Sequence, residues 1–194
     1  MSDERIVLVD ASVFITLAEI DRLSSLANVA GRLVVPKPVQ NELTSDVAAR
    51  ELSARTPDEI EVWDVALAPL HAAASHLGKP LSEEETEGYE HATIEGDIAL
   101  LALALDPAAP DRDTADDSLV LTDDKPLRKT CKALSIPVSG SIGVLVRAVE
   151  RGDLSPEDAT AALEAMDEVG ARLSASLLRR AERLIADAAM QANE

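Results

Sequence analysis

A short apolar run that stops at an aspartate limits the fold of this chain more than any other feature. Ile6 to Val9 has the composition of a buried strand, and Asp10 follows it directly. Residues 11–19 then carry apolar side chains at helical spacing. This order of strand, acidic turn and helix is typical of α/β proteins, in which helices connect parallel strands.

The same alternation continues along the 194 residues. Further strands are predicted at 33–35, 60–65, 119–121 and 136–138, with 60–65 as a half-exposed edge strand. Helices are predicted at 23–29, 38–52, 98–105 with a start near 95–97, 125–134, 140–151, 156–166 and 174–186. Residues 66–94 and 106–117 are interpreted as insertions, with 78–91 as a surface helix or loop. The pattern predicts a three-layer α/β/α sandwich around a central, mostly parallel sheet, with extra helices at the carboxyl end. We expect a domain over residues 1–150 and a helical extension over 151–194 packed on it.

Acidic residues follow two of the predicted strands and lie on two of the predicted helices. They are Asp10, Glu42, Asp97, Asp123 and Asp124, with Glu95 as a second candidate for the position of Asp97. Because sites in parallel sheets lie beyond the carboxyl ends of the strands, we expect these acids to converge on one crevice. Converging carboxylates raise each other's pKa, and a divalent cation removes that cost. Mg²⁺ or Mn²⁺ bound by such oxygen ligands is suited to activating water against a phosphodiester.

Because the chain has 36 Asp and Glu residues, each of these acids taken singly reads as part of a surface coat. Their setting distinguishes them. The segment 7–12, VLVDAS, resembles the first-strand motif of the PIN-domain family of Mg²⁺-dependent nucleases, and 34–43, VVPKPVQNEL, resembles the strand, proline and helix of the second motif. The segments 96–104, GDIALLALA, and 121–128, LTDDKPLR, resemble the third and fourth motifs.

The resemblance implies an endonuclease, with RNA as the expected substrate, that leaves a 5′-phosphate. Asp10, Glu42, Asp97 (or Glu95) and Asp123 or Asp124 would hold one or two Mg²⁺ or Mn²⁺, and Thr122 or Ser12 would orient an acid or the attacking water. The closing helices look most like those of PIN proteins described only as nucleic-acid-binding. A type II toxin with an antitoxin protein as partner is one biological setting, and homodimers are common in the family. The rival hypothesis is a non-catalytic PIN-like module for nucleic-acid binding or assembly.

Four basic residues fall on one helix face directly after the fourth acidic motif. Lys125, Arg128, Lys129 and Lys132 are spaced i, i+3, i+4 and i+7. This face is interpreted either as a contact for substrate phosphates or as a solvated surface. His71, His76 and His91 lack metal-site spacing and are expected at the surface. Cys131 is expected to be a buried structural thiol.

The net charge of −18 excludes a generic electrostatic clamp on a polyanion. With one Phe, one Trp and one Tyr, the chain also lacks the rings that an RNA-recognition motif or OB-fold uses for base stacking. The acidic excess resembles the proteins of salt-accumulating archaea, whose surface charges are screened by molar salt. The chain has a single cysteine, and the sequence shows neither a signal peptide nor an apolar run of membrane length. These features predict a cytoplasmic protein without a membrane partner.

Overall fold

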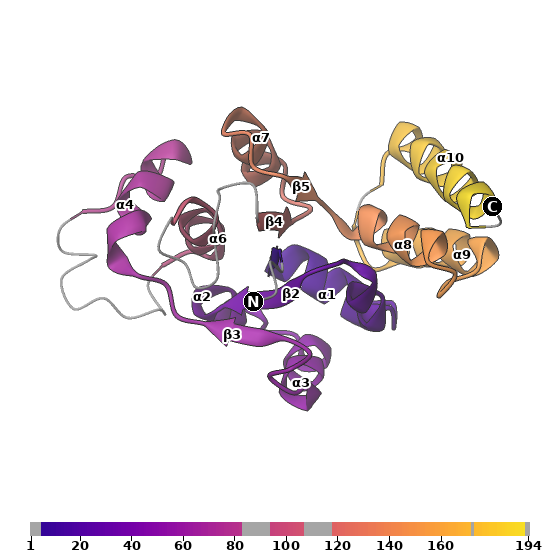
Figure 1. The fold of residues 1–194 in the computed structure, drawn as a ribbon, viewed down its shortest axis with the longest axis horizontal. Coiled ribbons are helices and arrows are strands. Elements are labelled where there is room, and N and C mark those ends of the chain that lie inside the picture. The colour runs from indigo at the N-terminus through magenta and orange to yellow at the C-terminus, as the bar shows by residue number, and fades with distance from the viewer. Residues whose placement is uncertain (1–4, 83–93, 107–117, 172, 193–194) are drawn as a thin grey trace.

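The computed structural model describes residues 5–82, 94–106, 118–171 and 173–192 (Figure 1). The strands in this part of the chain are β1 (Ile6–Val9), β2 (Arg32–Pro36), β3 (Glu61–Trp63), β4 (Ser118–Leu121) and β5 (Val138–Ser139). The helices are α1 (Ala11–Glu19), the 3-10 helix η1 (Leu23–Asn28), α2 (Lys37–Glu42), α3 (Asp46–Ala54), α4 (Leu67–His76), α6 (Gly96–Leu105), α7 (Lys125–Ala133), α8 (Ser141–Glu150), α9 (Pro156–Glu168) and α10 (Ala175–Gln191).

The strands form one five-stranded sheet with the order β3-β2-β1-β4-β5, and every pairing is parallel. The predicted parallel sheet is therefore confirmed, with the half-exposed segment β3 at one edge. β1 lies at the centre, and all four of its residues are buried. Because every strand points the same way, the residues that follow β1, β2 and β4 emerge at one edge of the sheet.

Helices cover both faces of this sheet, as the predicted three-layer sandwich requires (Figure 1). On one face α6 packs across β1, β2 and β4, with α4 and α7 beside it. On the other, α1 contacts α3 and α8. Residues 98–104 of α6 are all buried, which explains their almost continuous apolar sequence.

Several predicted boundaries differ from the structure: the strand at 60–65 is only Glu61–Trp63, and the helix at 174–186 continues to Gln191. Two further differences lie near the acidic residues. The helix expected over 38–52 is two helices, because the backbone leaves the helical region at Leu43 and Ser45 caps a new helix by accepting a hydrogen bond from the Ala48 N–H at 3.1 Å. Glu42 is consequently the last residue of α2. The final strand lies at 138–139 rather than 136–138, where Val138 and Ser139 pair with β4.

The region interpreted as an insertion contains α4, which the sequence analysis did not assign to a helix. Its apolar residues Leu70, Ala73 and Ala74 are buried against the rest of the fold, and the helix contacts α6. Pro69 in its first turn obscured the pattern, although proline is tolerated there. The predicted loop or helix at 78–91 is described only up to residue 82, and the insertion at 106–117 lies outside the described residues from 107 on.

The carboxyl-terminal helices α9 and α10 pack on α8 and on each other. Ser155 and Ser174 cap them, each accepting a backbone N–H in the first turn. α10 buries Ala181, Ile185 and Ala188 and exposes its other faces. None of the helices in the described residues is long and apolar enough to cross a bilayer.

Candidate metal centre

The sheet register places Asp10 beside Thr122. Val9, the last residue of β1, pairs with Leu121, the last residue of β4. The next residue of each strand therefore lies at the same level, and the Asp10 N–H donates to the Leu121 carbonyl at 2.9 Å. Asp10 is only 6% exposed, although it is an acid at the end of a strand.

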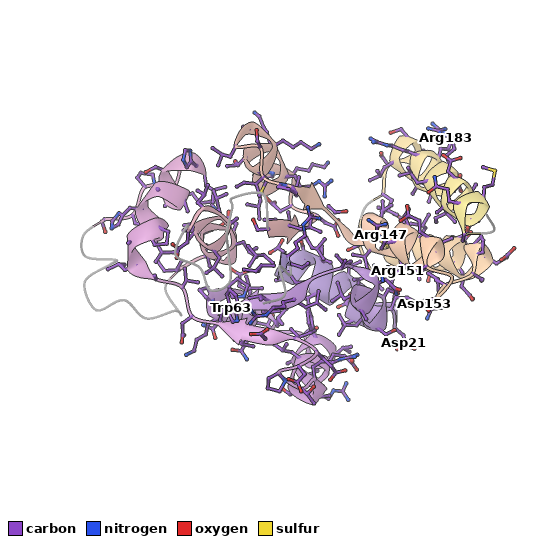
Figure 2. All side chains as sticks on the ribbon, in the orientation of Figure 1. Asp21, Trp63, Arg147, Arg151, Asp153 and Arg183 are labelled. Carbon is purple, nitrogen blue, oxygen red and sulfur yellow. The ribbon has the colours of Figure 1, made fainter. Side chains whose placement is uncertain are left out.

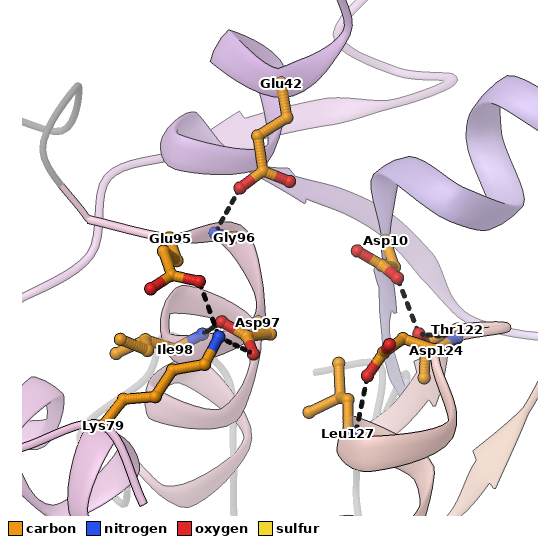
Figure 3. Close-up of polar contacts among 10 residues, drawn as sticks. All are labelled: Asp10, Glu42, Lys79, Glu95, Gly96, Asp97, Ile98, Thr122, Asp124 and Leu127. Carbon is orange, nitrogen blue, oxygen red and sulfur yellow. Dashed lines mark hydrogen bonds and ion pairs between the residues drawn. The ribbon is translucent and has the colours of Figure 1, made fainter. Parts of the chain in front are cut away.

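Two hydroxyl groups hold the Asp10 carboxylate, that of Thr122 directly after β4 (Figure 3) and that of Ser12 in the first turn of α1. Thr122 Oγ1 and Ser12 Oγ each donate to Asp10 Oδ2 at 2.6 Å. The two hydroxyls in turn accept backbone N–H groups at 3.0 Å, Thr122 from Asp124 and Ser12 from Asp123. Both predicted orienting residues thus point their protons at one carboxylate oxygen, an arrangement that orients an ionised acid.

Burial raises the pKa of Asp10 above its ordinary value. The hydroxyl bonds from Ser12 and Thr122 lower it in part, and the negative charge of Asp124 adds to the rise. Among the described residues no basic side chain forms an ion pair with Asp10. A buried carboxylate supported only by hydroxyls is a site that a cation would stabilise.

Glu42 reaches from the end of α2 to the start of α6 (Figure 3). Its Oε1 accepts a hydrogen bond from the Gly96 N–H at 2.6 Å, so it satisfies one of the free amides at the amino terminus of that helix. Partial burial of the carboxyl group raises the pKa of Glu42, and the charges of Asp10, Asp97 and Glu95 raise it further. The structure therefore brings Glu42 into electrostatic contact with three of the other predicted acids.

Glycine is required where Glu42 meets α6. A Cβ added to Gly96 would lie 2.7 Å and 2.9 Å from the two carboxylate oxygens of Glu42 and 2.9 Å from Val39 Cγ2. No side chain fits in that space without displacing Glu42. Gly96, the glycine of the third sequence motif, therefore leaves room for the Glu42 carboxylate in addition to starting α6.

Asp97 lies in the first turn of α6, as predicted, with 18% of its side chain exposed. Its Oδ1 accepts the Ile98 N–H at 2.8 Å, and its Oδ2 binds the Lys79 ammonium, also at 2.8 Å. The same Lys79 Nζ is 2.6 Å from Glu95 Oε2. The sequence analysis missed Lys79, because no motif marks a lysine beyond the end of an unassigned helix.

Asp123 and Asp124, which the sequence analysis could not separate, have different partners. Asp123 accepts hydrogen bonds from the backbone N–H and hydroxyl of Ser141, at 3.1 and 2.5 Å, and so faces the start of α8. Asp124 caps α7 by accepting the Leu127 N–H at 2.7 Å. Of these two acids, Asp124 is the one whose charge raises the pKa of Asp10.

Five of the predicted acids, Asp10, Glu42, Glu95, Asp97 and Asp124, thus lie at one edge of the sheet (Figure 3). In the described part of the chain, however, no three Asp, Glu, His or Cys side chains are grouped closely enough to hold a metal ion. Each acid has partners within the protein. The donor set consists of hard oxygen ligands and suits Mg²⁺ or Mn²⁺, and the Lys79 ammonium occupies the cation position beside Asp97.

The basic face of α7 is not uniform. Lys125, Lys129 and Lys132 are exposed, whereas Arg128 is half-buried and donates to the Thr122 carbonyl at 2.8 Å. Arg128 therefore supports the loop that carries Thr122. The three lysines are the residues of this face that remain exposed to solvent beside the acid cluster.

Other predictions of side-chain placement are confirmed where the structure describes them. His71 and His76 are exposed, and His91 lies outside the described residues. Cys131 is buried, and burial raises the pKa of its thiol to about 11. The thiol is therefore protonated at neutral pH and is not a nucleophile.

The comparison with protein families agrees with this arrangement. A family model described as a PIN domain (DUF3368) matches residues 6–187, from the first residue of β1 into α10. The chain belongs to the PIN-domain family. The match to this PIN domain spans both the predicted 1–150 unit and most of the predicted extension. PIN domains are in general nucleases that act on nucleic acids and typically use divalent metals. No curated protein matches the chain.

Proposed function

We propose that this PIN domain is a Mg²⁺-dependent endonuclease and that RNA is its substrate. The observation that carries the proposal is the burial of Asp10 without a basic partner among the described residues, in electrostatic contact with Glu42 and Asp124 at the carboxyl edge of the sheet. A buried acid surrounded by further negative charges is costly unless a cation binds there. In the PIN fold that cation would be Mg²⁺ or Mn²⁺.

We assign Asp10, Glu42, Asp97 and Asp124 as the residues that would hold the metal. When bound, the divalent ion would supply Lewis-acid activation of the scissile phosphate and of water. Thr122 and Ser12 donate to Asp10 Oδ2 and so favour the ionised form of this carboxylate and orient it. Asp123, whose oxygens bind Ser141, is assigned a supporting role at the start of α8.

The experiment that tests the function is a cleavage assay on single-stranded RNA, structured RNA and DNA of the same sequence. Cleavage of RNA that needs Mg²⁺ or Mn²⁺ and stops with a chelator supports the proposal. Cleavage of DNA alone would contradict the assignment of RNA, and the absence of metal-dependent cleavage of any of the three substrates would contradict the nuclease.

The first variant tests the contact between Glu42 and α6. Replacing Gly96 by Ala should lower Mn²⁺ affinity and cleavage about 10- to 100-fold, because the new Cβ displaces the Glu42 carboxylate. The fold should persist, since alanine is the better helix former. Mn²⁺ titration, cleavage rates and circular dichroism measure these effects.

The matched variant for Gly96→Ala is Glu42→Gln, which keeps an acceptor for the Gly96 N–H but removes the charge. If Glu42 only caps α6, Glu42→Gln should bind Mn²⁺ like the wild type. A Gly96→Ala protein with wild-type Mn²⁺ affinity would show that Glu42 is not a ligand.

The second variant tests the lysines of α7. Replacing Lys129 and Lys132 by Ala should weaken RNA binding for all sequences and reduce the salt slope of binding by about 0.7 for each lost phosphate contact with a single strand. Arg128 is left in place because it binds the Thr122 carbonyl. Filter binding in Ca²⁺ over a KCl series measures the slope, and an unchanged slope would show that this face is only solvated.

A non-catalytic nucleic-acid-binding or assembly module is the second candidate. It is favoured by one observation, that Glu42, Asp97 and Asp124 already have hydrogen-bond partners within the protein. Such a module would bind RNA without cleaving it in any divalent metal. An antitoxin partner and a homodimer are settings that co-purification and sedimentation would test separately.

A further inference from the structure

A lysine from outside the sequence motifs lies within the acid cluster. Lys79 Nζ is 2.8 Å from Asp97 Oδ2 and 2.6 Å from Glu95 Oε2, so one ammonium bridges the two acids that compete for the third motif position (Figure 3). Among the described residues it is the cation that forms ion pairs with this cluster. The ion pair with Lys79 therefore affects whether Asp97 is available to a metal ion.

The backbone after α4 holds Lys79 in this position. Gly78 has φ +71°, its N–H donates to the Ser75 carbonyl at 3.1 Å, and the Lys79 N–H donates to the Ala74 carbonyl at 2.9 Å. These bonds form a Schellman motif, which requires a left-handed residue and therefore favours glycine. Since α4 packs along α6, the motif delivers Lys79 to the first turn of α6.

The charge of Lys79 is secured by its partners. Partial burial alone would lower the pKa of Lys79, but the hydrogen bonds to Asp97 and Glu95 outweigh it and raise the pKa. Both oxygens of Asp97 are in use, because Oδ1 accepts the Ile98 N–H. A divalent cation that binds Asp97 Oδ2 would meet the Lys79 ammonium as a like charge on the same oxygen, and the two would repel each other.

We infer that Lys79 is a tethered cation that neutralises Asp97 and Glu95 while the site holds no metal, and that a divalent ion must displace it from Asp97. The inference rests on the proposed function, because it takes Asp97 as a metal ligand. Lysine is suited to this exchange, since its compact ammonium sits on a flexible stem. Glu95 is 62% exposed and can keep the ammonium after Asp97 has released it.

Two opposite effects follow for Lys79→Met, which keeps the length of the side chain and removes the charge. Without metal the variant should melt at a lower temperature than the wild type, because Asp97 and Glu95 then repel each other without compensation. It should bind Mn²⁺ about three- to tenfold more tightly, the range expected from the loss of a competing, partly exposed ion pair. Calorimetric titration of the chelator-treated protein with Mn²⁺ and thermal melts measure both effects at the same KCl concentration.

The matched control is Arg147→Met, which removes one positive charge and an exposed ion pair with Glu150 on α8, away from α4 (Figure 2). It should leave Mn²⁺ affinity within twofold of the wild type. Lys79→Arg keeps the charge and should also resemble the wild type. If Lys79→Met does not fold, Lys79→Gln removes the charge with a polar side chain and should also tighten Mn²⁺ binding.

The outcomes separate the inference from the proposed function. The inference is overturned if Lys79→Met, or Lys79→Gln in its place, binds Mn²⁺ no more tightly than the wild type. The metal site is unaffected by that result. The same holds if Arg147→Met tightens binding as much as Lys79→Met, since the effect is then one of net charge. If neither the wild type nor Lys79→Met binds Mn²⁺, the proposed function fails together with the inference.

Discussion

Replacing Asp10 by Asn should reduce metal-dependent cleavage at least about 100-fold, beyond the loss of about 10- to 100-fold that is typical for residues that support a metal ligand. The reason is the position of Asp10, which is buried, feels the charges of Glu42 and Asp124, and is oriented by the Ser12 and Thr122 hydroxyls. An amide in its place lacks the charge that would bind a divalent ion. Single-turnover cleavage at saturating Mg²⁺ measures the loss.

The same variant should be more stable than the wild type in the absence of metal. The raised pKa values of Asp10 and Glu42 mean that the folded chain binds more protons than the unfolded chain once the pH rises above their ordinary values of about 4. The free energy of unfolding therefore falls as the pH rises through this window. In Asp10→Asn the loss of unfolding free energy that comes from Asp10 is absent. The variant should therefore melt about 2–4 °C above the wild type near neutral pH, the shift that ~1 kcal/mol produces in a chain of this size.

The control for Asp10→Asn is Asp187→Asn on the exposed surface of α10, which removes one negative charge far along the chain from the cluster. Urea unfolding with a chelator, followed from pH 4 to pH 8, compares the three proteins. Wild-type cleavage by Asp10→Asn at saturating Mg²⁺ would remove Asp10 from the catalytic assignment. An equal gain in stability from Asp187→Asn would show that the gain reflects net charge rather than the buried acid.

The second large effect concerns salt. Both folding and cleavage should increase from 0.1 M to molar KCl, because the Debye length shrinks from about 10 Å to about 3 Å and screens the net charge of −18. Repulsion between surface acids is illustrated by α9, where the exposed acids have no basic residue on the same helix. These acids are Glu157, Asp158, Glu164, Asp167 and Glu168. Ordinary nucleic-acid binders lose affinity as salt rises, because counterion release then drives binding less strongly. For cleavage by this protein to increase, the gain in folded protein must outweigh that loss of affinity.

Circular dichroism and cleavage rates over the same KCl series test this prediction. Sucrose is the control, since it favours the folded state by exclusion from the surface but does not screen charge. A protein that is fully folded at 0.1 M KCl and whose cleavage only declines with added salt contradicts the salt requirement. Equal recovery in sucrose would attribute the effect to general stabilisation instead of screening.

Local sequence patterns were sufficient for the elements whose residues interact mainly with near neighbours or with a continuous core. The run Ile6–Val9 and the apolar helix after Gly96 could be assigned because strand and buried-helix periodicities are visible within a few residues. The order of strands and helices then predicted the parallel sheet and the edge at which the acids gather. The acids of the candidate site could be named from that edge together with the four segments that resemble PIN-domain motifs.

Long-range packing decided what those patterns left open. The choice between Asp123 and Asp124 depends on which backbone amides each carboxylate meets, and those belong to α8 and α7. The close approach of Glu42 to Gly96 joins residues 54 positions apart in the sequence. Lys79 reaches Asp97 only because α4 packs along α6 and ends in a left-handed turn. Hydrogen-bond geometry and helix packing set such contacts, and these depend on three-dimensional distance rather than on sequence periodicity.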